Sequence, residues 1–145
     1  MTDGIYKSFS AATCDVLKLM FNLEAESCKL DEMDSNLNDG IFIIIGLCGN
    51  LNGEVNFLIS KNTAIKLIRI LSGMDFDEID DFVTSAIGEV GNIISGNALA
   101  KLFEQQIICD ILPPQIKIDS LDLPKSQKVY RVCTEAGNID FWVKI

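Results

Sequence analysis

Ser85, Glu89 and Asn92 lie four and three residues apart in SAIGEVGNIISGNALAKLF (85–103), a segment with helical periodicity. Residues at these spacings share one face of a helix, so the hydroxyl, the carboxylate and the amide project together. The chain contains no histidine, which excludes Ser-His-Asp and Cys-His nucleophilic mechanisms and ordinary zinc sites that use histidine. Any chemistry must therefore use carboxylates, amides, hydroxyls or groups supplied by a partner.

Gly88, Gly91 and Gly96 interrupt the same segment, although each glycine costs a helix interior about 0.8–1.0 kcal/mol relative to alanine. Gly88 and Gly96 fall on the polar face, where a missing side chain lets another surface approach the helix closely. We therefore predict a docking face that carries two reaching polar groups, Glu89 and Asn92, while Gly91 is expected to serve contact with another helix. A second interpretation stays open from the residues alone, because Glu and Asn on an exposed helix face are most often only solvated.

The hydrophobic pattern predicts the elements that must position these side chains. Helices are expected over residues 6–22, 62–73 and about 77–103, and strands over 40–48, 53–60, 107–114, 128–135 and 138–145, with a short edge strand within 27–39. The apolar face of the longest helix is predicted to comprise Phe82, Val83, Ala86, Ile87, Val90, Ile93, Ile94 and Ala98. The order of elements predicts an α/β protein of the α+β type, in which a mostly antiparallel six-stranded sheet carries about three helices on one face.

The first predicted helix carries a degenerate copy of the polar motif. Asp15, Leu19 and Asn22 have the same spacing as the three polar residues of the longest helix, and both copies precede similar strand patterns. This similarity predicts two pseudo-repeated halves. Because Leu19 replaces the carboxylate and bulky Phe21 replaces a glycine, we expect the first copy not to dock productively.

Length and composition restrict the class of protein. The chain has 145 residues, which predicts a single domain over residues 1–145, and its net charge of −9 argues against a nucleic-acid or anionic-membrane partner. No stretch approaches the roughly 18 apolar residues of a membrane span, and the opening residues lack the pattern of a secretory signal. The five cysteines are odd in number and form no CxxC pair, so we interpret them as apolar core residues of a cytoplasmic protein.

Both faces of the predicted strand GIFIIIGLC (40–48) are apolar, and Trp142 projects opposite Phe141 and Val143, toward a side where solvent is expected. Helices on one side leave a second face, which an antiparallel sheet exposes to water only if that face is polar. We therefore predict a homodimer that buries part of the second face. The alternative is a few exposed apolar side chains, as on most proteins.

The segment 85–103, followed by DILPPQIKI (110–118), resembles the CheC/CheX/FliY family of chemotaxis phosphatases. Ser85, Glu89 and Asn92 match the family motif in register, and Pro114 follows after 21 intervening residues, one fewer than in the family pattern. The resemblance extends over about residues 40–119. A single intact motif favours the CheX type. The predicted homodimer also resembles the quaternary state of CheX-type members.

The resemblance implies dephosphorylation of the phospho-aspartate of a CheY-like response regulator. An acyl phosphate is already activated, so catalysis is mainly the positioning of a water in line with the leaving carboxylate. Asn92 is expected to position that water and Glu89 to form a salt bridge with the receiver's active-site lysine. Ser85, Gly88 and Gly96 are expected to contact the partner. We expect no metal or other cofactor on this chain, and Mg²⁺ to be supplied by the receiver.

Two other classes stay open. One is a noncatalytic receiver-binding or flagellar-switch adaptor on the same fold, although an intact Glu-x-x-Asn argues against it because a pure binder has no use for a water-positioning amide. The other is a metal enzyme that uses the acidic cluster at 75–81. Acidic residues at the start of a helix complement its dipole, which explains the cluster more simply.

Overall fold

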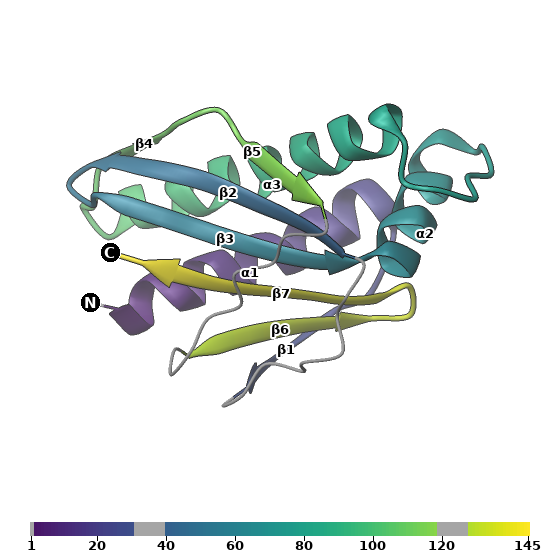
Figure 1. The fold of residues 1–145 in the computed structure, drawn as a ribbon. Helices are drawn as coiled ribbons and strands as arrows, with labels where there is room; N and C mark the ends of the chain where they lie inside the picture. Colours follow the sequence, from purple (N-terminus) through teal and green to yellow (C-terminus); the bar gives the residue numbers. More distant parts are fainter. Residues whose placement is uncertain (1, 31–39, 119–127) are drawn as a thin grey trace.

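The computed structural model describes residues 2–30, 40–118 and 128–145 (Figure 1). The helices are α1 (Thr2–Phe21), α2 (Lys61–Ser72) and α3 (Asp81–Glu104). The strands are β1 (Glu26–Leu30), β2 (Gly40–Gly49), β3 (Gly53–Ser60), β4 (Cys109–Ile111), β5 (Gln115–Ile118), β6 (Val129–Thr134) and β7 (Gly137–Lys144). No helix among these elements is sufficiently long and apolar to cross a lipid bilayer.

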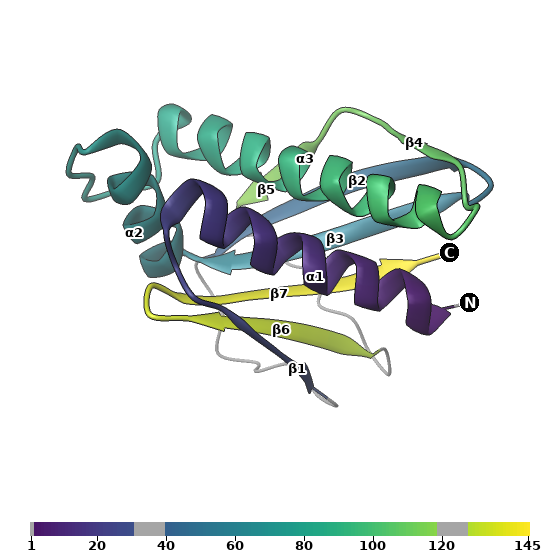
Figure 2. The same cartoon turned by 180° about the vertical axis from the view of Figure 1, so that it is seen from behind.

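The strands form one antiparallel sheet in the order β1-β6-β7-β3-β2-β4, and β5 pairs with β2 on the edge that β4 also uses. The described sheet is therefore six strands wide, because β4 and β5 share one position. Helices α1 and α3 lie side by side across one face of the sheet, and α2 lies at the end where β3 finishes (Figure 2). The predicted fold class is confirmed.

The sheet order also confirms the two pseudo-repeated halves. The first half of the chain contains β1, β2 and β3, and the second half contains β4 to β7. From one edge the sheet runs β1-β6-β7, and from the other β4-β2-β3, so the two matching parts of the sheet meet between β7 and β3. Each half exchanges its edge strand, since β1 pairs with β6 of the second half and β4 and β5 pair with β2 of the first. Helices α1 and α3 are the matching helices of the two halves, which is why the two copies of the motif lie on neighbouring helices.

Each face of the sheet carries a cluster of buried apolar side chains. On β2, Ile41, Ile43 and Ile45 point into the core under the helices, whereas Phe42 belongs to a second cluster on the other face. Trp142 is in that second cluster and is 0% exposed. Trp142 lies on the face opposite Phe141 and Val143, as predicted, but it is already buried within the single chain. It therefore gives no support to a homodimer, which stays a prediction.

Capping side chains and a glycine explain where α2 begins and ends and where α3 begins. Ser60 caps α2, with its hydroxyl accepting from the Thr63 N–H, and Gly73 ends it in the left-handed conformation, as predicted. Helix α3 begins at Asp81 rather than near residue 77, because the Asp80 carboxylate accepts the Val83 N–H at 2.9 Å and forms the cap.

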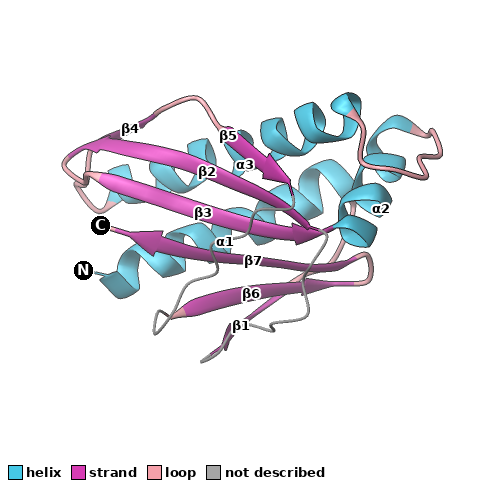
Figure 3. Ribbon diagram, in the orientation of Figure 1, coloured by secondary structure: helices cyan, strands magenta, loops and turns pink. Residues whose placement is uncertain are grey.

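The strand predicted over 107–114 is shorter than expected. It contains only β4, because Pro113 and Pro114 lack the N–H that would continue the ladder. The chain loops outward at the prolines and returns to β2 as β5, a strand that the sequence analysis missed (Figure 3). The predicted edge strand within 27–39 corresponds to β1, and residues 31–39 lie outside the described residues.

Candidate functional site

Helix α3 separates its side chains as predicted. Its buried side includes five residues of the predicted apolar face, Val83, Ile87, Val90, Ile94 and Ala98. Ser85, Glu89 and Gly96 are exposed on the outer side, and Asn92 is partly buried. Phe82 is the exception, since it was placed on the apolar face and is 52% exposed.

Glu89 and Asn92 are three residues apart on the same helix, so their Cβ atoms are roughly 5–6 Å apart. Neither side chain has a hydrogen-bond or ion-pair partner in the part of the chain that the structure describes. The backbone that carries them is held by the buried side of α3 and by its Asp80 cap. The structure thus presents a carboxylate and an amide together, on a rigid element and available to a partner.

Gly96 is open, whereas Gly88 is not. A Cβ atom added at Gly96 would have no atom within 4 Å, so the surface there can be approached closely. A Cβ at Gly88 would lie 2.5 Å from Ile116 Cδ1, and Gly88 is buried. The expectation that Gly88 is exposed to a partner is therefore wrong. Its missing side chain lets β5, which carries Ile116, pack on α3.

Gly91 also serves packing, but not between helices. A Cβ at Gly91 would lie 3.2 Å from Ile43 Cγ2 and 3.6 Å from Ile45 Cδ1, both on β2. The glycine therefore allows α3 to lie close to the sheet. Pro114 directly precedes β5, and so stands at the start of the segment that covers Gly88.

The first copy of the motif cannot act as a second site. Asp15 is held by an ion pair, with the Lys101 Nζ atom 2.9 Å from its Oδ2 atom. Leu19, in place of the carboxylate, is 80% exposed. Lys101 is thereby also engaged, and α1 and α3 are joined across their outer edge.

Asn22 lies beyond the end of α1 and has a positive φ of 55°. Its N–H donates to the Lys18 carbonyl oxygen, and the N–H of Leu23 donates to the Leu17 carbonyl oxygen, both at 3.1 Å. The bond from Asn22 to Lys18 is that of an αL cap, in which asparagine tolerates the left-handed conformation. Asn22 therefore ends the helix and is not positioned as Asn92 is.

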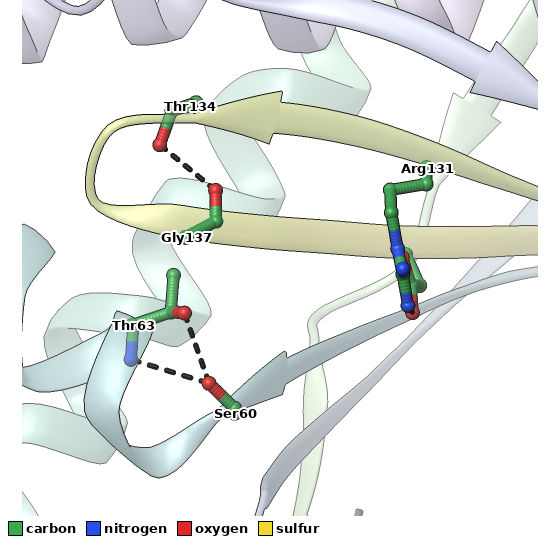
Figure 4. Close-up of polar contacts among 6 residues, drawn as sticks. Ser60, Thr63, Arg131, Thr134 and Gly137 are labelled. Carbon is green, nitrogen blue, oxygen red and sulfur yellow. Dashed lines mark hydrogen bonds and ion pairs between the residues drawn. The ribbon is translucent and has the colours of Figure 1, made fainter. Parts of the chain in front are cut away.

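A polar pocket of about 200 Å³ lies on the opposite face of the sheet, beside the β6–β7 turn, and Figure 4 shows its polar contacts. Arg131 and Asp140 line it and form a bidentate ion pair. Arg131 Nε donates to Asp140 Oδ1 at 2.8 Å, and Arg131 Nη2 donates to Asp140 Oδ2 at 3.1 Å. Ser60 and Thr63 line it too, and their hydroxyls bond to each other in the α2 cap. Because these polar groups hydrogen-bond to one another, they are less available to a ligand than Glu89 and Asn92 on α3.

The described part of the chain meets neither the requirements of a metal site nor those of an activated thiol at Cys14. Among the described residues, no group of three or more His, Cys, Asp or Glu side chains could hold a metal ion. Burial raises the pKa of the Cys14 thiol, and the neighbouring Asp15 carboxylate raises it further. A raised pKa disfavours the thiolate, so Cys14 is not an activated nucleophile.

Solved structures with the same fold include those of chemotaxis proteins. A CheC-like superfamily protein from Shewanella sp. PV-4 superposes with a TM-score of 0.81, at 19% identity, over 99% of this chain and 97% of that chain. The CheX–CheY–BeF3–Mg²⁺ complex from Borrelia burgdorferi contains a chain that matches with a TM-score of 0.75, at 24% identity, over 95% of each chain.

The sequence matches the same group. The CheY-P phosphatase CheX of Thermotoga maritima is 34% identical over 74 residues, which is 50% of this chain, and the match spans about half of that curated relative, 48%. The family model described as chemotaxis phosphatase CheX matches residues 41–134, more than half of the chain and including the Glu89–Asn92 segment. The chain therefore belongs to the CheX family of chemotaxis phosphatases.

Proposed function

We propose that this chain hydrolyses the aspartyl phosphate of a CheY-like response regulator. The observation that carries the proposal is the Glu89–Asn92 pair on a helix that is buried along its other side. Glu89 is exposed, Asn92 is partly buried, and neither has a partner among the described residues. Membership of the CheX family supports it, and so does the name of the Thermotoga maritima relative, a CheY-P phosphatase.

The proposed reaction uses water as the nucleophile. The water oxygen attacks phosphorus, the bond from phosphorus to the aspartyl oxygen breaks, and the carboxylate leaves as inorganic phosphate forms. The Asn92 amide oxygen accepts a hydrogen bond from the water and aligns it with the leaving carboxylate. Glu89 accepts hydrogen bonds from the ammonium of the receiver's active-site lysine and so fixes the docked geometry.

The receiver supplies the positive charge that the transferred phosphoryl group requires. The only basic residue of α3, Lys101, is paired with Asp15. Phosphoryl transfer is promoted by metal ions and cationic side chains that neutralise developing charge. We therefore assign Mg²⁺ and the lysine to the receiver, and the complex of the Borrelia burgdorferi CheX and CheY contains Mg²⁺.

We place this reaction in the cytoplasm and retain the homodimer as part of the proposal. The four cysteines whose side chains are described, Cys14, Cys48, Cys109 and Cys133, are free thiols, which fits a reducing compartment. A dimer that leaves the outer side of α3 uncovered would keep one docking site in each subunit. Sedimentation at micromolar concentration tests this state against a monomer of 16.0 kDa.

The activity test uses a panel of CheY-like receivers phosphorylated with acetyl phosphate and follows the decay of the aspartyl phosphate. We expect this chain to accelerate the decay of at least one receiver in the presence of Mg²⁺. Glu89→Ala should weaken both binding and rate, whereas Glu104→Ala, an exposed glutamate at the end of the same helix, should match wild type.

Binding to phosphorylated receivers without acceleration would overturn the catalytic proposal and favour the adaptor. Neither binding nor acceleration with any receiver would overturn the choice of partner as well. Wild-type activity in both glutamate variants would refute the role given to Glu89.

A further inference from the structure

Two exposed apolar groups lie on either side of the Glu89–Asn92 pair. Leu19 on α1 is 80% exposed, more than any other large apolar side chain in the described residues. Phe82 on α3 is 52% exposed and stacks on Phe76, with ring centroids 5.4 Å apart and an interplanar angle of 12°. Apolar side chains that a docked partner covers contribute to binding through the area they bury, and aromatic residues are enriched at the centre of interfaces.

Two contacts between α1 and α3 place Leu19 near the site. The Asp15–Lys101 ion pair and the bond from Gln105 Nε2 to Ser8 Oγ, at 3.0 Å, fix the helices as antiparallel neighbours (Figure 2). Leu19 is one turn beyond Asp15, which brings it level with the turn of α3 that precedes Lys101 and contains open Gly96. With helix axes about 9 Å apart and 1.5 Å of rise per residue, Leu19 lies roughly 12 Å from Asn92.

Phe82 lies on the other side of the pair, along the same helix. It is three residues before Ser85 and seven before Glu89, so it belongs to the same stripe of α3. Seven residues correspond to about 10 Å of helix axis. The stack on Phe76 holds the ring in place, so little side-chain freedom is left to lose when a partner binds.

Both groups lie within the footprint of one docked protein. A stable interface covers about 800 Å² on each partner, which is a disc of about 16 Å radius. A receiver centred on the Glu89–Asn92 pair would therefore cover Leu19, Gly96, Phe82 and Phe76 together. We propose that Leu19 and the Phe76–Phe82 stack are the apolar contacts that hold the receiver on this face and select which receivers are substrates.

This inference rests on the proposed function and gives the degenerate motif a role. The first copy has lost its carboxylate and its amide geometry, yet its central position still faces outward beside the intact copy. A leucine there adds binding area without competing for the receiver's lysine. The first half of the chain thus contributes Leu19 to specificity, and α3 contributes both Phe82 and the catalytic pair.

The test separates binding from rate with Leu19→Ser and Phe82→Ser. Affinity is measured for a receiver loaded with Mg²⁺ and beryllium trifluoride, which imitates a phosphoryl group, and kcat and KM are measured with phosphorylated receiver. Each variant should raise Kd and KM about tenfold, as expected for loss of a well-buried apolar contact, with kcat within twofold of wild type. Ile145→Ser is the control, because Ile145 is 64% exposed and follows β7, so it belongs to neither α1 nor α3.

If wild type is active and Leu19→Ser has unchanged Kd and KM, the role proposed for Leu19 as an apolar contact is wrong, whereas the proposed function is unaffected. Since Leu19 is exposed, its variant should keep the wild-type melting temperature, and a loss of binding explained by unfolding would be visible there. If the two variants dissociate a dimer while receiver affinity is unchanged, the surface binds a second copy and the inference is wrong. If wild type binds no receiver, the proposed function and the anchors fail together.

Discussion

Replacing Gly96 should stabilise the protein and damage its activity at the same time. Gly96 lies inside α3, and a Cβ there meets no atom within 4 Å, so no steric cost opposes the gain in helix propensity. Alanine should add about 0.8–1.0 kcal/mol to the free energy of unfolding and leucine slightly less. For a chain of this length, 1 kcal/mol raises Tm by about 2–4 °C.

Docking should respond in the opposite direction. The leucine side chain of Gly96→Leu would extend several ångströms above the surface that a receiver must approach. It would lie next to Asn92, which is one turn earlier on α3. We expect KM for phosphorylated receiver to rise at least about tenfold, equivalent to about 1.4 kcal/mol of lost binding free energy. Gly96→Ala is the matched control, because it brings the same stabilisation with a single methyl group.

Thermal unfolding and steady-state dephosphorylation of the three proteins provide the comparison. The expected pattern is a raised Tm in both variants, with a small change of KM for alanine and a large one for leucine. A stabilised Gly96→Leu protein with wild-type KM would refute the idea that this glycine exists for partner approach.

Three further results are expected. Asp80→Ala should lower the free energy of unfolding by about 1 kcal/mol in urea titrations, since it removes the cap bond to the Val83 N–H, and an unchanged value would contradict the assigned cap. Asn22→Ala should cost stability through left-handed strain while leaving the dephosphorylation rate unchanged; a loss of rate would mean that the first motif is active. Burial raises the pKa of Tyr6, with a small further rise from Tyr130 and an opposing effect of the bond from the Val143 N–H. Because the neutral phenol is favoured in the folded state, its stabilisation is complete below the ordinary pKa of about 10 and is lost as pH rises through the raised value. Urea titrations between pH 9 and 11 should show a steeper loss of stability for wild type than for Tyr6→Phe, and equal slopes would contradict this.

Local patterns in the sequence predicted most of the fold. The α2 helix could be bounded from Ser60 and Gly73, because a hydroxyl cap and a left-handed glycine act within a few residues. The outer face of α3 followed from spacing alone, and the structure places Glu89, Asn92 and Gly96 on it. Such features depend on neighbours three or four residues away, which sequence periodicity records directly.

Contacts between distant segments explain what was missed. Gly88 has the periodicity of the exposed face, but Ile116 of β5 covers it. The strand β5 was not predicted, because it follows directly after two prolines, which indicated the end of a strand. Asn22 has the spacing of a motif residue, but the helix ends one residue earlier. Trp142 lies among side chains that suggest solvent, yet Phe42 and Leu58 from two other strands join it in a buried cluster. Tertiary packing decides each of these positions.

The most direct measurement of the central claim is the single-turnover decay of a phosphorylated receiver saturated with Asn92→Ala protein. Asn92 is partly buried on the outer side of α3 and has no hydrogen-bond partner in the described structure, so the fold should persist. We predict that the variant binds the receiver with near wild-type affinity, that the decay returns to the rate of the receiver alone, and that Asn138→Ala, an exposed asparagine on β7, behaves as wild type. Decay at the wild-type rate with Asn92→Ala bound would contradict the claim that this amide positions the attacking water.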